Sequence, residues 1–144
     1  MSDQTIRLIA AGVLLVHGLG HGGALAALAW IRLRPGTPTG GWLAARSWLA
    51  PSLPVDTASA IASACWVVVL VGFVIAAMSF WGVVVPGAVW RPLAVASAIV
   101  STVGVLFFLG TWPMNYTVAA LGVNVAVLVA VLWLHWPTEA MLGR

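Results

Sequence analysis

Residues 58–81 read ASAIASACWVVVLVGFVIAAMSFW, a run that contains no charged side chain. A helix that spans a bilayer needs about 20 mainly apolar residues, because the hydrocarbon core is about 30 Å thick and each helical residue rises about 1.5 Å. The run meets this requirement over its whole length. It therefore predicts a membrane-spanning helix from about Ala58 to Trp81.

Three further runs, one before and two after, meet the same requirement. They cover about residues 6–30, 92–111 and 116–136. Pro92 stands at the first turn of its run, where a missing N–H costs nothing, and Pro137 follows the last run, where it stops a helix. The chain is therefore expected to be one all-α transmembrane domain, residues 1–144, folded as a four-helix bundle.

The composition makes lipid, rather than water, the expected solvent for most side chains. Hydrophobic residues form 62% of the chain and charged residues 6%, whereas soluble domains carry about 25% charge. The net charge of +3 comes from six arginines against three acids, and the arginines lie singly near the ends of the apolar runs. Because they form no basic patch, nucleic acid is not an expected partner. The single cysteine, Cys65, excludes an internal disulfide.

Tryptophan positions give an independent test of the four spans. Tryptophan is favoured at the membrane–water interface, where its ring is apolar and its N–H can stay hydrated. Eight of the nine tryptophans fall near the ends of the expected helices, and only Trp66 lies inside a span. One face would hold Trp30, Trp42, Trp48 and Trp112, and the other Trp81, Trp90, Trp133 and Trp136.

The first connection, about residues 31–57, is the longest of the three. Its middle, Trp42 to Ala50, places Arg46 among apolar residues and predicts a short amphipathic helix in the interface plane. The alternative is a simple surface linker, because nine residues carry little periodicity. Three arginines fall on each face of the membrane, so the positive-inside rule does not choose an orientation.

Two histidines in the first span are the most unusual feature of the chain. His17 and His21 lie in the segment VHGLGHGG, residues 16–23. Their i, i+4 spacing places both rings on one helix face. Ionisable side chains near the middle of a span are rare, usually face the bundle interior and are candidates for function.

Several roles are open for this pair. His17 and His21 could supply half of a metal site. One of them could be an axial ligand to haem, with the other beside it. They could instead hydrogen-bond a polar ligand such as a quinone or a lipid headgroup. The structural alternative is a hydrogen bond between helices, which contributes roughly 1 kcal/mol or less in a membrane.

Depth counted along the alternating helices indicates which other polar residues could join the histidines. Cys65, Thr102 and Asn124 lie at about the same depth as His21 when each is counted from the face that holds Trp30. The sequence therefore predicts a ligand-binding layer of His17, His21, Cys65, Thr102 and Asn124.

The glycines around the histidines predict close packing or a slot for a flat ligand. Gly18 and Gly22 form a small-xxx-small pair, which lets another helix approach the backbone, and Gly20 and Gly23 add to it. No motif for acyl transfer or nucleotide binding is present, and the three acids lie near the ends of spans. A pump that depends on a buried carboxylate is therefore not expected.

The stretch Val16 to Gly22 and the four-span layout resemble the DoxX-like group of small bacterial four-helix membrane proteins, many of which carry a glycine and a histidine in the first helix. The resemblance implies a bacterial inner-membrane location. Most of that group has no assigned activity, so it implies no reaction.

Two functions are expected, in order. The first is a non-enzymatic accessory subunit, which buries small-residue faces against other subunits of a larger membrane complex or against copies of itself. The second is a binding protein for a hydrophobic ligand or redox cofactor, such as a quinone, lipid, haem or metal, held at His17 and His21. An enzyme is the third possibility.

Overall fold

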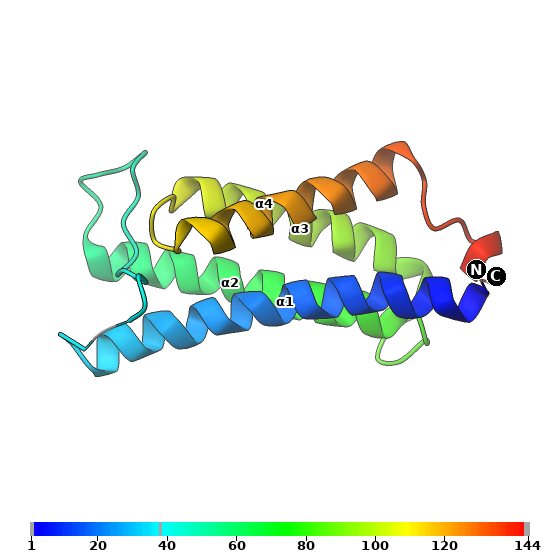
Figure 1. Cartoon of the computed structure of the whole chain (residues 1–144), viewed down its shortest axis with the longest axis horizontal. Helices are drawn as coiled ribbons and strands as arrows, with labels where there is room; N and C mark the ends of the chain where they lie inside the picture. Colours follow the sequence, from blue (N-terminus) through cyan, green and yellow to red (C-terminus); the bar gives the residue numbers. More distant parts are fainter. Residues whose placement is uncertain (1, 38, 143–144) are drawn as a thin grey trace.

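The computed structural model describes residues 2–37 and 39–142, and within them the chain is helical with no strand (Figure 1). The four long helices are α1 (Asp3–Leu33), α2 (Val55–Ser79), α3 (Trp90–Phe107) and α4 (Met114–Leu128). The π-helix η2 (Val129–Trp133) continues α4, and the short 3₁₀ helices are η1 (Gly87–Val89) and η3 (Ala140–Leu142). The predicted all-α four-helix fold is confirmed.

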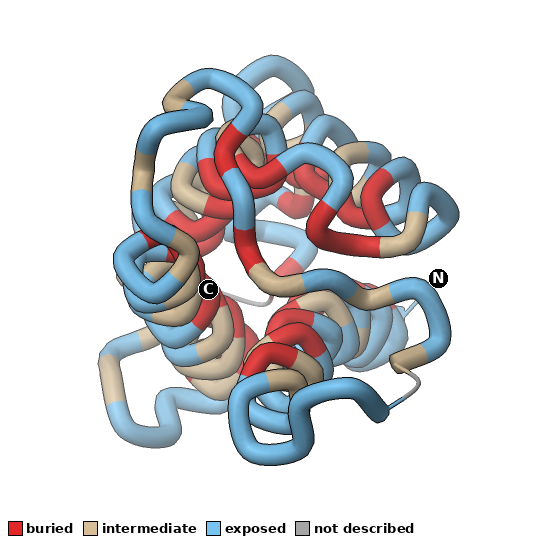
Figure 2. The backbone as a smooth tube through the Cα atoms, turned by 90° about the vertical axis from the view of Figure 1, so that its left-hand side faces the viewer, coloured by how far each residue is buried: buried red, intermediate tan, exposed pale blue. Residues whose placement is uncertain are grey.

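The outer surface of the bundle is apolar, as a lipid-facing surface must be. All four long helices, with η1 and η2 added to α3 and α4, are long and apolar enough to cross a membrane. Large apolar side chains stand exposed along them, among them Val68 and Leu132. Figure 2 shows buried residues facing the inside of the bundle and exposed residues covering the outside. The protein is therefore a small integral membrane protein.

Helices that follow one another in the chain pack against each other, but the bundle is open between the first helix and the last. α1 packs on α2, α2 on α3 and α3 on α4, whereas the backbones of α1 and α4 hardly approach each other. The start of α1 and the helix η3 lie at the same end of the bundle (Figure 1). The seam between α1 and α4 is therefore the place where the bundle interior can open towards lipid.

Glycines make the closest helix contacts possible. A Cβ at Gly18 would lie 3.0 Å from the Cβ of Phe73 and 3.3 Å from the carbonyl oxygen of Leu70, so α1 lies directly against α2 there. A Cβ at Gly104 of α3 would lie 2.8 Å from the Trp66 ring of α2. Trp66 is 0% exposed. Close packing of this kind holds membrane helices together, because lipid provides little hydrophobic drive between them.

The helices end close to their expected limits. The Ser2 side chain caps α1 by accepting a hydrogen bond from the backbone N–H of Thr5. The third span was expected to reach Thr111, but α3 ends at Phe107. The chain turns there because Gly110 adopts a φ of +91° and the Thr111 N–H bonds the Phe108 carbonyl.

The short helix expected over residues 42–50 is not formed, and that prediction is wrong. Residues 42–47 have no regular secondary structure. A free segment of nine residues is too short to hold a helix by itself. Contacts with the bundle end hold it in an extended path instead: the Leu43 N–H donates to the Thr111 carbonyl, and the Trp48 Nε1–H donates to the Leu106 carbonyl.

Two of the tryptophans assigned to the membrane interface have a different role. Trp90 and Trp112 lie near helix ends as expected, but both are buried in the bundle. Trp90 packs on Phe80 with ring centroids 4.9 Å apart. Depth along the chain alone could not separate a tryptophan facing lipid from one that fills the end of the core.

The C-terminal segment is fastened to α3 through Arg91. Its Nε lies 3.2 Å from the Glu139 carboxylate, its guanidinium donates to the Pro137 carbonyl, and it covers the Trp90 ring. We expect Glu139→Gln to cost less than about 1 kcal/mol, because the ion pair is partly exposed. Arg91→Ala should cost more, since it removes all three contacts. Thermal unfolding in detergent would measure both, and equal losses would contradict the assignment.

Candidate functional site

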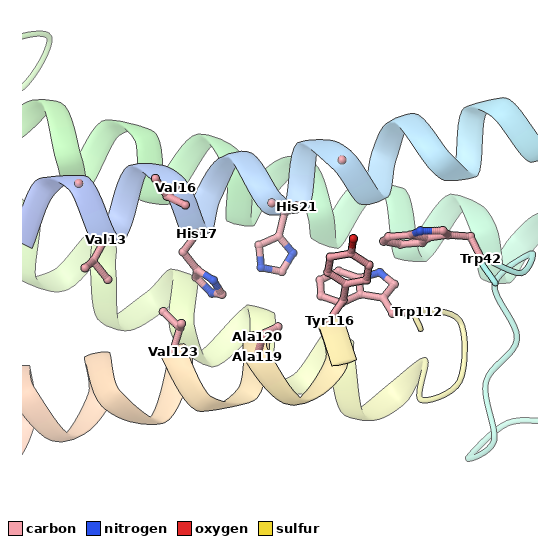
Figure 3. Close-up of a pocket in the computed structure, with 13 residues that line it drawn as sticks. Val13, Val16, His17, His21, Trp42, Trp112, Tyr116, Ala119, Ala120 and Val123 are labelled. Atoms are coloured by element: carbon pink, nitrogen blue, oxygen red, sulfur yellow. The ribbon is translucent and has the colours of Figure 1, made fainter. Parts of the chain in front are cut away.

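A groove of about 770 Å³ lies between α1 and α4, in the half of the bundle nearest the first connection (Figure 3). Its walls come from α1 and α4, and aromatic side chains close one end. The lining residues are Gly12, Val13, Val16, His17, Gly20, His21, Gly23, Trp42, Trp112, Tyr116, Ala119, Ala120 and Val123. The predicted histidine pair is therefore part of a cavity wall.

The groove is deep because glycines, which have no side chain, form part of its wall. A Cβ at Gly20 or Gly23 would meet no atom within 4 Å, and small alanines face them from α4. The glycines of the histidine segment thus divide into two sets. Gly18 and Gly22 face α2, where they permit packing. Gly20 and Gly23 face the groove, where they leave space.

A chain of three hydrogen bonds joins the two histidines through two other helices. His17 Nε2 lies 2.8 Å from Asn124 Oδ1. The Asn124 amide Nδ2 donates to Ser101 Oγ over 2.8 Å, and Ser101 Oγ lies 3.0 Å from His21 Nε2. The chain links α1, α4 and α3, and it holds α1 to α4 across a seam where their backbones do not pack.

The positions of the hydrogens follow from the partners. Asn124 Oδ1 can only accept, so His17 Nε2 carries a hydrogen and donates it. Ser101 has one hydroxyl hydrogen, and donating it to His21 Nε2 gives it a partner. The reverse assignment would leave the Ser101 hydrogen without a partner among the described residues, in addition to His21 Nδ1, which is unpaired in both assignments. The first assignment leaves the hydrogen of His21 on Nδ1.

His21 Nδ1 is buried and has no hydrogen-bond partner in the described part of the chain. The residue is 1% exposed. Nearly all buried polar groups in proteins are paired, so an unpaired one indicates a place for a water or a ligand atom. Figure 3 shows the His21 ring between His17 and the aromatic end of the groove, with one ring nitrogen on each side.

Aromatic rings form the closed end of the groove. The Trp42 ring centroid lies 5.8 Å from those of both Trp112 and Tyr116. The His21 ring lies 5.2 Å from Trp112 and 5.3 Å from Trp66. These rings offer flat apolar faces next to the unpaired nitrogen of His21. The first connection supplies Trp42, so it helps to cover this mouth of the bundle.

The structure brings together only part of the predicted layer. His17, His21 and Asn124 meet, whereas the Thr102 hydroxyl donates to the Ala98 carbonyl of its own helix. Cys65 is half-buried beside Gly104, in the contact between α2 and α3. Neither Thr102 nor Cys65 lines the groove.

Ser101 is the residue that sequence reasoning missed. It precedes Thr102 by one position, which turns its side chain by about 100° around the helix. The buried small residues of α3 carried the signal: Ala94, Ala98, Ser101 and Gly104 recur at helical spacing and mark the face that points into the bundle.

The donor set does not complete a metal site. Within residues 2–37 and 39–142 no three His, Cys, Asp or Glu side chains form a cluster that could hold a metal ion. Asn124 and Ser101 also engage the Nε2 atoms of the two histidines. Two imidazoles supply only half of a tetrahedral shell. The arrangement is better suited to hydrogen bonding of an organic molecule.

The chain matches no protein family model, no curated protein and no solved structure. The likeness to DoxX-like proteins therefore stays a prediction.

Proposed function

We propose that this membrane protein binds a hydrophobic molecule that is dissolved in the bilayer, and that the groove between α1 and α4 is its binding site. One observation carries the proposal: a groove open at an unpacked helix seam is lined by His21, whose Nδ1 is buried without a partner. A ligand atom that accepts a hydrogen bond would satisfy this nitrogen.

The character of the groove supports ligand binding. Sites for small molecules typically have volumes of about 300–1,000 Å³ and apolar walls with a few polar groups. This groove fits that description, with valine, alanine and glycine walls and two histidines. Hydrogen bonds with Asn124 and Ser101 hold the histidine rings in place, so less conformational entropy is lost when a ligand binds.

The lining supports binding better than a reaction. Among the described residues, no carboxylate and no thiol lines the groove. The two histidines are joined through the Asn124 side chain, and an amide group is neither an acid nor a base near neutral pH. The chain of hydrogen bonds is therefore suited to holding the rings and poorly suited to passing a proton between them.

Filling the groove should remove the ligand. Gly20→Leu adds a side chain where a Cβ meets no atom, so the helix is kept while the cavity is occupied. We expect a small hydrophobic molecule to co-purify with the wild-type protein and to fall at least about tenfold in Gly20→Leu, a loss of about 1.4 kcal/mol in binding. Mass spectrometry of organic extracts measures it.

The matched control for this experiment is Gly122→Leu. Gly122 is also an exposed helical glycine with no atom within 4 Å of a Cβ, but it lies outside the groove. This variant should retain the wild-type amount of bound molecule. Identical extracts from the wild type, Gly20→Leu and Gly122→Leu would argue against a ligand in the groove.

An accessory role in a larger membrane complex is the second candidate. Two small-residue pairs, Ala60 with Ala64 and Gly122 with Ala126, are exposed on α2 and α4. Such pairs let a helix of another subunit approach closely. Co-purification with larger membrane proteins at a fixed ratio would support this role, and a monodisperse bundle on its own would count against it.

A further inference from the structure

A second apolar cavity continues the groove along the same seam. It has a volume of about 220 Å³ and is lined from α1, the start of α3, α4 and the segment that follows α4, including Leu14, Trp90 and Trp136. Val13 lines both cavities. Together they run along α1 from Ile9 to Gly23, a distance of about 21 Å at the helical rise per residue. The seam therefore offers a long, narrow path that begins beside His21.

In the part of the chain that the structure describes, no charged side chain lines either cavity. The polar groups come from the two histidines and from tyrosine and tryptophan, and the other lining residues are apolar. A charge placed in an apolar site without a partner carries a large desolvation cost. The occupant that fits this seam is therefore uncharged.

The depth of His21 separates the occupant from ordinary bilayer lipid. α1 has 31 residues, so it is about 46 Å long and exceeds the hydrocarbon core by about 16 Å. His21 stands twelve residues before Leu33, which places it on the order of 10 Å inside the hydrocarbon. A phospholipid offers only acyl chain at that depth. The oxygen that meets His21 must belong to a head that is itself soluble in hydrocarbon.

Rings at this position favour a flat head. Trp112 and Trp66 lie within 5.3 Å of the His21 ring, and Tyr116 stands at the same end of the groove. Aromatic side chains prefer offset or edge contacts with another ring at such distances. A flat ring that enters the groove and packs beside Trp112 and Tyr116 would bring an oxygen towards the His21 ring.

We propose that the ligand is an uncharged ring compound that accepts a hydrogen bond from His21 Nδ1 and extends a linear apolar tail past Val13 into the second cavity. This inference rests on the proposed function, because it names the class of molecule that the same groove takes.

Four probes with defined differences test the proposal on the full chain in nanodiscs, with empty nanodiscs as the reference for partition into lipid. 4-Decylacetophenone has the ring, the carbonyl and the tail. Decylbenzene lacks the acceptor, 4-decylbenzoate is charged, and 4-ethylacetophenone lacks the long tail. We expect 4-decylacetophenone to bind at least tenfold more tightly than each of the other three, once partition into lipid is subtracted.

Two variants test which residues cause this difference in affinity between the probes. His21→Phe keeps a ring but removes the donor, so binding of 4-decylacetophenone should fall to the level of decylbenzene. Val13→Phe narrows the junction of the cavities and should reduce 4-decylacetophenone to the level of 4-ethylacetophenone. Val68→Phe is the control, because Val68 is exposed on α2 and lines neither cavity.

The outcomes separate this inference from the proposed function. Binding of no probe above empty nanodiscs would overturn both. Binding that is independent of tail length, or unaffected by Val13→Phe, would overturn the tail while leaving the groove as a ligand site. Equal binding of the benzoate would overturn the uncharged head. Retention of the carbonyl preference in His21→Phe would overturn the role of Nδ1.

Discussion

Leucine in place of Gly104 should destabilise the bundle by about 3 kcal/mol or more, at the upper end of the range for overpacked interiors. Even a Cβ at this position would lie 2.8 Å from Cζ3 and 3.0 Å from Cη2 of Trp66. The Trp66 ring is 0% exposed and cannot move aside without displacing its neighbours. α2 and α3 would have to separate.

The same substitution should reach the site as well as the fold. Trp66 lies 5.3 Å from His21 and 5.1 Å from Trp112, between centroids. A shift of its ring is therefore passed directly to the aromatic end of the groove. Unfolding monitored by helical circular dichroism would measure the stability, and Gly122→Leu, which adds the same side chain in open space, should stay within about 0.5 kcal/mol of the wild type. Equal losses in both variants would show that the Trp66 contact does not set the effect, because leucine favours a helix more than glycine does and the loss cannot come from helix propensity.

Asn124→Leu should cost about 2 kcal/mol. Leucine has a similar size but neither donates nor accepts, so the substitution leaves the His17 Nε2–H without its partner and Ser101 without its donor. Hydrogen bonds between membrane helices average about 0.6 kcal/mol each. Leaving a buried group unpaired adds about 1–3 kcal/mol. The larger part of the loss therefore comes from the orphaned groups.

A spectroscopic measurement on His17 distinguishes loss of the hydrogen-bond chain from a general loss of stability. In the wild-type protein, ¹⁵N NMR of labelled histidine should show His17 with its hydrogen on Nε2, and Asn124→Leu should abolish that preference. Asn115→Leu is the control, because Asn115 is exposed near the start of α4 and takes no part in the chain. An unchanged stability together with an unchanged His17 spectrum would contradict the hydrogen-bond chain.

Several parts of the site could be predicted before the fold was known. The i, i+4 spacing placed His17 and His21 on one face, and counting depth along the helices brought Asn124 to the same layer. Depth is set by the membrane and by the helical rise, both of which are constant. The rotation of each helix is not constant in this way, and it decides that Ser101 rather than Thr102 faces the histidines.

The path of the first connection could not be predicted from the local sequence either. Residues 42–50 carry the composition of an amphipathic helix, yet their path is set by contacts with Thr111 and Leu106. These contacts join residues more than fifty positions apart, so the local sequence pattern does not indicate them. Trp42 became part of the groove for the same reason, as a ring that the connection places over Trp112 and Tyr116.

By itself, the sequence determined that the chain is a four-helix membrane protein with two histidines on one face of its first helix, because span length and side-chain periodicity depend only on local geometry and on the thickness of the bilayer. Only the tertiary structure decided that α1 and α4 do not close on each other, that Gly20 and Gly23 leave a groove there, and that His21 meets Ser101 with its Nδ1 unpaired. Those features depend on how each helix is rotated against its neighbours, and close packing at Gly18 and Gly104 sets that rotation.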